Sequence, residues 1–153
     1  MSLFYPYASG PFGPLPSWPR LVFNFAFSIL VGDFLLYWVH RISHWPIFYR
    51  WHKLHHDFVE PFGLSSEYMD PLELVVVGAA STVGAMLCMS HPLEAMFLLA
   101  VRAFLDVDHH CGYSLPWSVQ LLPGVVGAHF HDWHHEAFVR HFAILASSDN
   151  VLF

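Results

Sequence analysis

Residues 21–44 read LVFNFAFSILVGDFLLYWVHRISH, an apolar run that ends directly in His40 and His44. The apolar part, 21–39, is close to the roughly 20 residues that an α-helix needs to cross the hydrocarbon core of a bilayer. The two histidines are four residues apart, so they share one face of a helix. This stretch therefore predicts a membrane helix that carries imidazoles at its end.

Two further apolar runs follow, at 72–89 and 93–107. The first is rich in glycine, alanine and serine, and such small residues allow helices to pack closely in lipid. The second is short for a full span and contains Glu94, Arg102 and Asp106. The pattern predicts an all-α integral membrane protein with about three apolar membrane helices, and we expect residues 1–153 to form a single domain.

The composition agrees with a membrane protein. The chain is 56% hydrophobic and 12% charged, with a mean hydropathy of +0.45, whereas soluble domains carry about 25% charged residues. The net charge of -6 leaves no basic surface for nucleic acid. Two cysteines, Cys88 and Cys111, are too few for a disulfide framework.

The most informative residues are histidines, of which the chain has 13. They concentrate in the polar regions 40–70 and 108–141, and eight of them form three clusters with spacings of three and four residues, which place the rings of each cluster on one face of a helix. The clusters are His40/His44, His52/His55/His56 and His131/His134/His135. Neutral imidazole is a ligand for iron, copper and zinc, and eight rings are too many for one ion. The clusters predict a dinuclear metal site.

The residues around the clusters favour iron over zinc. No cluster carries the glutamate of an H-E-x-x-H zinc protease motif, and no Cys-x-x-Cys pair is present for structural zinc. Imidazoles beside a membrane, without thiolates, suit redox iron. Two irons can reduce dioxygen and so oxidise an unactivated C–H bond, while the protein holds the metals and places the substrate.

The order of the segments gives a topological expectation. If the second and third apolar runs form a hairpin, all three clusters lie on one side of the membrane, as a shared metal site demands. Arg41, Arg50 and Lys53 flank the first run on the cluster side, against Arg20 on the other. The positive-inside rule then predicts that the clusters are cytoplasmic.

Several acids are candidates for orienting the imidazoles through hydrogen bonds. They are Asp33, Asp106, Asp108 and Asp132. Asp33 is the strongest of them, because an acid at membrane depth needs a partner. Their alternative role is surface or interfacial charge.

The other histidines are weaker candidates. His109 and His110 are adjacent and point in different directions, so we expect only one to bind metal. His91 lies alone in a turn on the opposite side, where a metal-binding role is disfavoured, and His129 and His141 are intermediate. Nearby aromatic side chains suit an interfacial belt better than a substrate mouth. These are Tyr37, Trp38, Trp45, Tyr49 and Trp51.

Longer motifs extend the pattern beyond histidine. They are Gly32-Asp33-Phe34 with Tyr37-Trp38-Val39-His40-Arg41, the loop Pro61-Phe62-Gly63-Leu64-Ser65-Ser66-Glu67-Tyr68, His110-Cys111-Gly112-Tyr113 with Pro116-Trp117-Ser118, and Phe130-His131-Asp132-Trp133-His134-His135. From about Leu15 to Phe153, the chain resembles the fatty acid hydroxylase and sterol desaturase superfamily of membrane di-iron enzymes. It is most similar to the plant-type sterol C-4 methyl oxidases (methylsterol monooxygenases).

The resemblance implies oxygen-dependent oxidation of a C-4 methyl group of a sterol precursor, through alcohol and aldehyde to carboxylate. It implies an endoplasmic reticulum membrane location and electrons from NAD(P)H through a reductase and cytochrome b5. The implied iron ligands are His40, His44, His52, His55, His56, His110, His131, His134 and His135.

The chain departs from the family in three places. Asp70 stands before Pro71 where the family has a histidine, and a carboxylate there could replace an iron ligand. Family members usually carry further N-terminal membrane sequence, and their C-terminal stretch differs from 141–153. Other interpretations of the function therefore remain open. The protein could be another lipid hydroxylase or a sterol C-5 desaturase, or an inactive sterol-binding or scaffold relative, and its site could be filled by zinc. A three-run bundle is small for a tetracyclic substrate, so an oligomer or a partner chain is also plausible.

Overall fold

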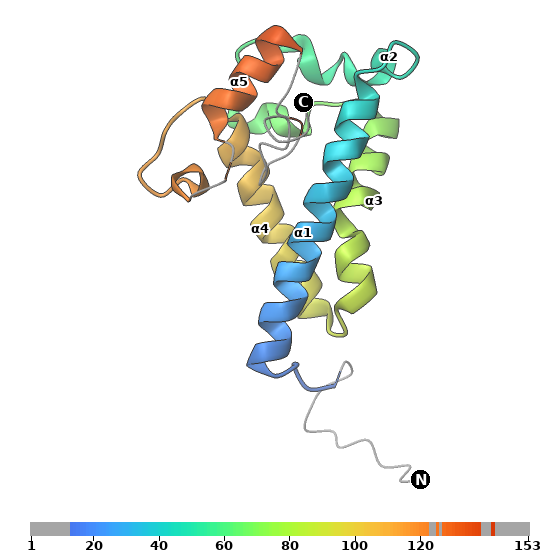
Figure 1. The fold of residues 1–153 in the computed structure, drawn as a ribbon, viewed down its shortest axis with the longest axis vertical. Helices are drawn as coiled ribbons and strands as arrows, with labels where there is room; N and C mark the ends of the chain where they lie inside the picture. The colour runs from blue at the N-terminus through green and yellow to red at the C-terminus, as the bar shows by residue number, and fades with distance from the viewer. Residues whose placement is uncertain (1–12, 123–124, 126, 139–141, 143–153) are drawn as a thin grey trace.

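The computed structural model describes residues 13–122, 125, 127–138 and 142, and the regular structure of these residues is entirely helical (Figure 1). Three long helices form the body of the molecule: α1 (Trp18–Ser43), α3 (Pro71–Cys88) and α4 (Pro92–His110). Shorter elements cover one end of it. They are α2 (Tyr49–His52), the 3-10 helices η2 (His55–Asp57), η3 (Gly63–Glu67) and η4 (Val119–Leu121), and α5 (Ala128–Ala137).

Two of the long helices meet the length and hydropathy of a membrane span. α1 has 26 residues and α3 has 18, whereas α4 is not such a candidate within the described residues. The 19 residues of α4 include four charged side chains, Glu94, Arg102, Asp106 and Asp108. Two of the three predicted membrane helices are therefore found as candidates.

The expected hairpin is present. α3 and α4 are joined by a tight connection at the end opposite the short helices, and α1 runs alongside α3 (Figure 1). At a rise of about 1.5 Å per residue, α1 is about 39 Å long, more than the hydrocarbon core of about 30 Å. Its last turns, with His40, can therefore extend beyond the bilayer core while the helix still spans it.

The contact between α1 and α3 depends on a small residue, as the composition of 72–89 predicts. A Cβ added to Gly84 would lie 2.5 Å from the Cα atom of Ser28 and 2.8 Å from its carbonyl oxygen. The Ser28 hydroxyl also lies 3.3 Å from the Cys88 sulfur. The two helices can approach this closely only because position 84 has no side chain.

The interior of the bundle is polar and much of its surface is apolar. Asn24 and Ser28 are fully buried, and Glu94 and Arg102 are nearly so, with Asn24 donating a 2.7 Å hydrogen bond to Glu94. The outer faces carry exposed large apolar side chains such as Val22, Leu30, Phe34, Val75, Met86, Leu87, Met96 and Phe97. This arrangement is typical of a protein whose helices face lipid.

Candidate metal centre

All three histidine clusters meet at the end of the bundle covered by the short helices. His40 lies in the last turns of α1, and His44 caps that helix. The second cluster does not lie on one helix: α2 ends at His52, and the chain continues into η2, which begins at His55. The third cluster lies on α5, as its spacing predicts. His110, the last residue of α4, joins them.

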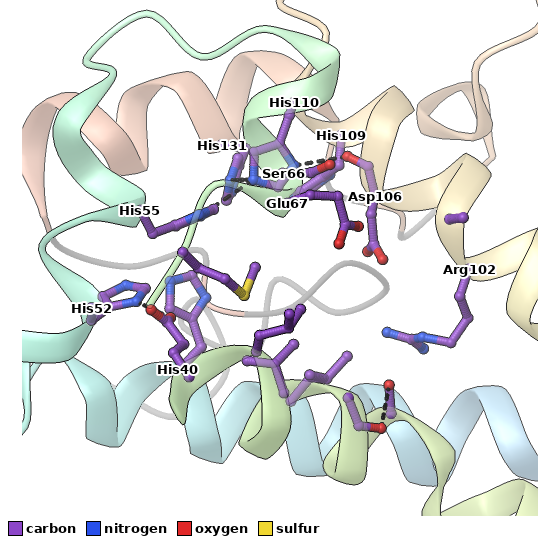
Figure 2. A pocket seen from close by; sticks show the side chains of 18 of the residues that line it. His40, His52, His55, Ser66, Glu67, Arg102, Asp106, His109, His110 and His131 are labelled. Atoms are coloured by element: carbon purple, nitrogen blue, oxygen red, sulfur yellow. Dashed lines mark hydrogen bonds and ion pairs between the residues drawn. The ribbon is translucent and has the colours of Figure 1, made fainter. Parts of the chain in front are cut away.

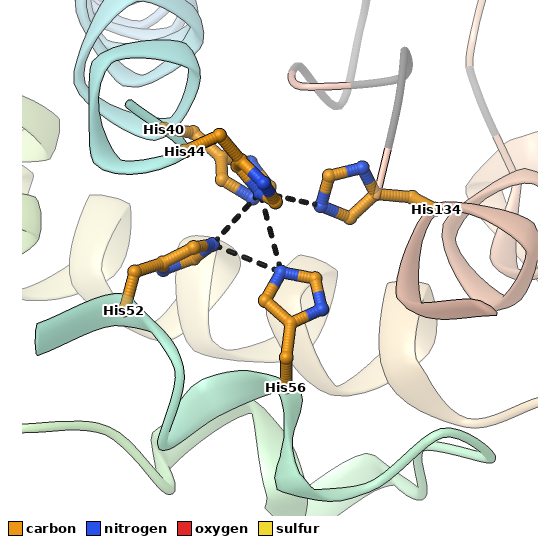
Figure 3. A group of neighbouring side chains, drawn as sticks. All are labelled: His40, His44, His52, His56 and His134. Carbon is orange, nitrogen blue, oxygen red and sulfur yellow. Dashed lines mark hydrogen bonds between the residues drawn. The ribbon is translucent and has the colours of Figure 1, made fainter. Parts of the chain in front are cut away.

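The imidazole nitrogens gather around two points. The five-histidine group contains His40, His44, His52, His56 and His134. Its Nε2 atoms converge (Figure 3): His52 and His56 lie 3.0 Å apart, His44 lies 3.0 Å from His52 and 3.2 Å from His56, and His134 lies 3.2 Å from His44. Side chains from α1, α2, η2 and α5 thus point at one position.

The four-histidine group contains His55, His110, His131 and His135. The Nε2 atom of His131 lies 2.8 Å from that of His110 and 3.1 Å from that of His135, and His110 and His55 are 3.3 Å apart. All four side chains are buried. Adjacent histidines divide between the groups, His55 from His56 and His134 from His135, because neighbouring side chains point in different directions. The second and third clusters therefore each supply two rings to one group and one ring to the other.

The opposite ring nitrogens are tied to acceptors that set the orientation of the rings. The Nδ1 atoms of His40, His110 and His135 lie 3.2, 2.7 and 3.0 Å from the carbonyl oxygens of Phe142, Asp106 and Phe58. A carbonyl only accepts, so each Nδ1 carries the proton. In a neutral ring this leaves a lone pair on Nε2, which in all three rings belongs to one of the two groups.

The spacing of these nitrogens fits a shared metal ion. Imidazole nitrogens at about 2.1 Å from one ion lie about 3.0 Å apart at right angles and about 3.4 Å apart in a tetrahedron. The observed separations of 2.8–3.3 Å lie within about 0.2 Å of this range. Hydrogen bonds among the rings are a poorer explanation, because a neutral ring has one N–H and several rings direct theirs outward. The buried Nε2 atom of His40 has no hydrogen-bond partner among the described residues.

Burial favours the neutral form of several of these rings. Burial, together with a smaller effect of neighbouring imidazoles, lowers the pKa of His44 to about 3 and the pKa of His135 to about 4, while the Phe58 carbonyl opposes the change at His135. Burial and then the His110 ring also lower the pKa of His55 and His131 well below the usual value. Lone pairs are therefore available to a metal ion at neutral pH without displacement of a proton.

A carboxylate that the sequence analysis did not single out supports the five-histidine group. Glu73, on α3, is buried, and its Oε1 atom accepts a short hydrogen bond from Nδ1 of His52. Its Oε2 atom is buried without a hydrogen-bond partner among the described residues. Carboxylates commonly orient metal-binding imidazoles and raise their basicity. The feature of the sequence that could have identified Glu73 is its position as an acid within the apolar run 72–89.

The predicted acids lie outside both groups. Asp70 is the N-cap of α3, where its carboxylate accepts a 2.8 Å hydrogen bond from the Leu72 amide. Asp108 accepts a 2.6 Å hydrogen bond from the Ser118 hydroxyl. Asp33 is buried in α1, and Asp132 is partly buried on α5. Helix capping thus accounts for Asp70 without a metal.

The remaining histidines also lie outside the two groups. His109 is buried, with its ring centre 4.5 Å from that of His131. His91 caps α4 at its N-terminus, at the far end of the bundle, and accepts a 3.2 Å hydrogen bond from the Leu93 amide. His129 is exposed, and His141 lies outside the described residues. Of the adjacent pair His109 and His110, His110 belongs to a group and His109 does not.

A cavity of about 310 Å³ connects the histidines with the helical bundle (Figure 2). At one end its wall includes His40 and His52 of the five-histidine group and His55, His110 and His131 of the four-histidine group. Further along it is lined by apolar residues of α1, α3 and α4, namely Leu36, Leu74, Val77, Leu99 and Ala103. Both groups are therefore accessible to an apolar molecule held between the three long helices. None of the five aromatic residues proposed for a belt lines this cavity.

Comparison with known proteins defines the class. The sequence model of the fatty acid hydroxylase family matches residues 25–152 of this chain. The chain belongs to this family.

The individual relatives include proteins named for sterol oxidation and proteins named for aldehyde decarbonylation. A Dictyostelium discoideum protein named as a candidate methylsterol monooxygenase is 42% identical over 85% of this chain and 49% of its own length. Methylsterol monooxygenase 2-2 of Arabidopsis thaliana is 41% identical over 80% of this chain and 47% of its own length. A very-long-chain aldehyde decarbonylase of Oryza sativa is 39% identical over 80% of this chain and 47% of its own length. The chain spans about half the length of these relatives, and no solved structure matches it.

Proposed function

We propose that the protein binds two irons in its histidine groups and uses dioxygen to oxidise a C-4 methyl group of a sterol precursor. The observation that carries the proposal is the position of the two groups at one end of a single, largely apolar cavity. The methylsterol monooxygenases among the relatives support the choice of substrate. The proposed ligands are the five and the four histidines of the two groups.

The donor set suits this chemistry. Nine imidazoles without a thiolate favour a redox-active first-row metal over structural zinc. When iron is bound, it supplies the electrons that activate dioxygen. The protein's own contribution is to hold the rings with their lone pairs aimed at two points, to exclude water from the buried site and to place the methyl group beside it.

The first oxidation requires an external electron source. One oxygen atom of O2 enters the methyl C–H bond to give an alcohol, and the other leaves as water after two electrons and two protons are added. We propose that the electrons come from NAD(P)H through a reductase and cytochrome b5. Arg41, Arg50 and Lys53 lie in or near the short segments on the cluster side, in line with a cytoplasmic site in the endoplasmic reticulum membrane.

Turnover with a 4,4-dimethylsterol tests the proposal. The chain, purified in mild detergent and loaded with ferrous iron, is supplied with a chemical reductant and O2, and products are identified by mass spectrometry. A hydroxymethyl, aldehyde or carboxylate product supports C-4 oxidation, and a new ring double bond supports a desaturase instead. A long-chain aldehyde is tested in parallel, because of the rice relative. Iron-loaded protein that converts none of these substrates would support an inactive sterol-binding relative.

A further inference from the structure

A buried arginine faces the cavity away from the histidines. Arg102 lies on α4, is only 6% exposed, and points its guanidinium into the cavity (Figure 2). Within the described residues, no ion pair or hydrogen bond is found for it. A buried cation without a directly contacting acceptor is costly, and an ionisable residue at membrane depth commonly marks a ligand site.

The surrounding helices leave room for this side chain. A Cβ added to Gly32 of α1 would lie 3.3 Å from a guanidinium nitrogen of Arg102 and 3.1 Å from the carbonyl oxygen of Ser81 on α3. The guanidinium thus lies against the contact between α1 and α3. Both helices have small residues at this point, which keeps the end of the arginine within the cavity.

Asp106 lies between Arg102 and the metal groups. It is four residues beyond Arg102 and four before His110, so the three residues lie along α4 at steps of about 6 Å. The backbone carbonyl of Asp106 holds the His110 ring at 2.7 Å. The carboxyl groups of Asp106 and Glu67 face the cavity near each other (Figure 2), and the charges of Arg102 and Glu67 both act on Asp106.

We propose that Arg102 and Asp106 bind the hydroxyl group of the substrate, a step that rests on the proposed sterol oxidation. A hydroxyl can accept a hydrogen bond from a guanidinium and donate one to a carboxylate at the same time. The hydroxyl of a sterol is on C-3, next to C-4. Anchoring it beside Asp106, one helical turn from His110, directs the neighbouring C-4 methyl group toward the metal groups.

The charges disfavour a different ligand. A carboxylate-bearing lipid would pair with Arg102 but would be repelled by Asp106 and Glu67. A neutral alcohol satisfies the donor and the acceptor together. A site that hydrogen-bonds a hydroxyl in this way rejects an analogue that lacks it, because the buried groups of the protein are then left unpaired.

Binding to iron-free protein tests this inference separately from catalysis. The probes are a radiolabelled 4,4-dimethylsterol, its 3-ketone, which can only accept a hydrogen bond, and its 3-methyl ether, which cannot donate one. We expect wild-type protein to bind the alcohol roughly 10- to 100-fold more tightly than the ether. Equal affinity for the two would overturn the inference, and this comparison requires no variant.

Two variants then assign the contacts. Arg102→Met should weaken binding of both alcohol and ketone, whereas Asp106→Ala should weaken binding of the alcohol alone and Asp106→Asn, which keeps an acceptor, should restore it. Arg20→Met is the matched control, because Arg20 is exposed at the other end of α1. The melting temperature of each variant, and the amount of iron that it binds when iron is added back, show that it is folded. Unchanged alcohol affinity in folded Arg102→Met would also overturn the inference.

The outcomes separate the two proposals. Hydroxyl-selective binding without turnover would leave this inference standing and contradict the proposed function. Turnover of a 4-methylsterol without hydroxyl selectivity would support the proposed function and contradict this inference. Absence of any sterol binding would overturn the inference.

Discussion

The five-histidine group and the four-histidine group share ligands from η2 and α5, but α1 and α2 complete the first and α4 completes the second, and the two are held differently. In the first, His52 is hydrogen-bonded to the Glu73 carboxylate, whereas in the second, the Nδ1 atoms of His110 and His135 face backbone carbonyls. The four-histidine group contributes three rings to the cavity wall and the five-histidine group two. A negative charge behind a ligand stabilises a more oxidised ion. The two metal positions are therefore expected to be inequivalent, with the four-histidine group having the fewer ligands.

The largest expected effects come from removing one ligand from each group. His134→Ala should disturb the five-histidine group and His55→Ala the four-histidine group. Each should lower sterol turnover by more than about 100-fold, which exceeds the effect typical of a residue that only hydrogen-bonds to a metal ligand. Turnover is measured by product formation with saturating reductant.

His129→Ala is the matched control, because His129 is exposed on the same helix as His134. Turnover retained in His55→Ala would contradict the need for the four-histidine group.

A smaller and more selective effect is expected from Glu73→Gln. Glutamine keeps an acceptor for His52 but removes the charge, so metal affinity or activity should fall roughly 10- to 100-fold. Mössbauer spectroscopy of the iron-57 protein should show a change in one of two iron signals.

Glu67→Gln removes a carboxylate that lines the same cavity but belongs to neither histidine group, and it should leave both signals unchanged. A Glu73→Gln spectrum in which both irons change equally would contradict the inequivalence.

A substitution at the contact between α1 and α3 should destabilise the helical bundle as a whole. Gly84→Ala forces a Cβ against Ser28 and should cost about 1–3 kcal/mol of unfolding free energy. Gly78→Ala is the control, since a Cβ there meets nothing within 4 Å. Thermal unfolding in detergent measures the difference, and equal stability of the two variants would contradict the close contact.

The smallest effect is expected at Asp70. Because it caps α3, Asp70→Ala should cost about 1 kcal/mol of unfolding free energy, and Asp70→Ser, which keeps a capping oxygen, should cost little. Iron content should not change in either variant. Loss of iron in both would show that Asp70 is a ligand after all.

Much of the site could be predicted from sequence because its ligands follow helical spacing. His40 and His44, or His131 and His135, are four residues apart and so share a face. Glu73 was missed because its partner, His52, is 21 residues away and meets it only when α3 packs beside α2. The capping role of Asp70 could have been recognised from the proline that follows it, since proline is favoured in the first helical turn.

The fold was predicted in its helices and hairpin but less well in its details. The second cluster was expected on one face of a helix, yet α2 ends at His52, and His55 and His56 lie in the 3-10 helix η2 that follows. Spacing alone does not show where a short polar helix ends. α4 was expected as a third membrane helix, but it is not a candidate span within the described residues, and two of its four charged residues, Arg102 and Asp106, line the cavity.

The most direct test of two metal positions is the iron and zinc content per chain of wild-type protein purified under reducing, iron-replete conditions. The account predicts about two irons per chain and little zinc, with about one iron retained in His134→Ala and in His55→Ala. Absence of iron, or a single iron lost completely in both variants, would contradict two separate centres.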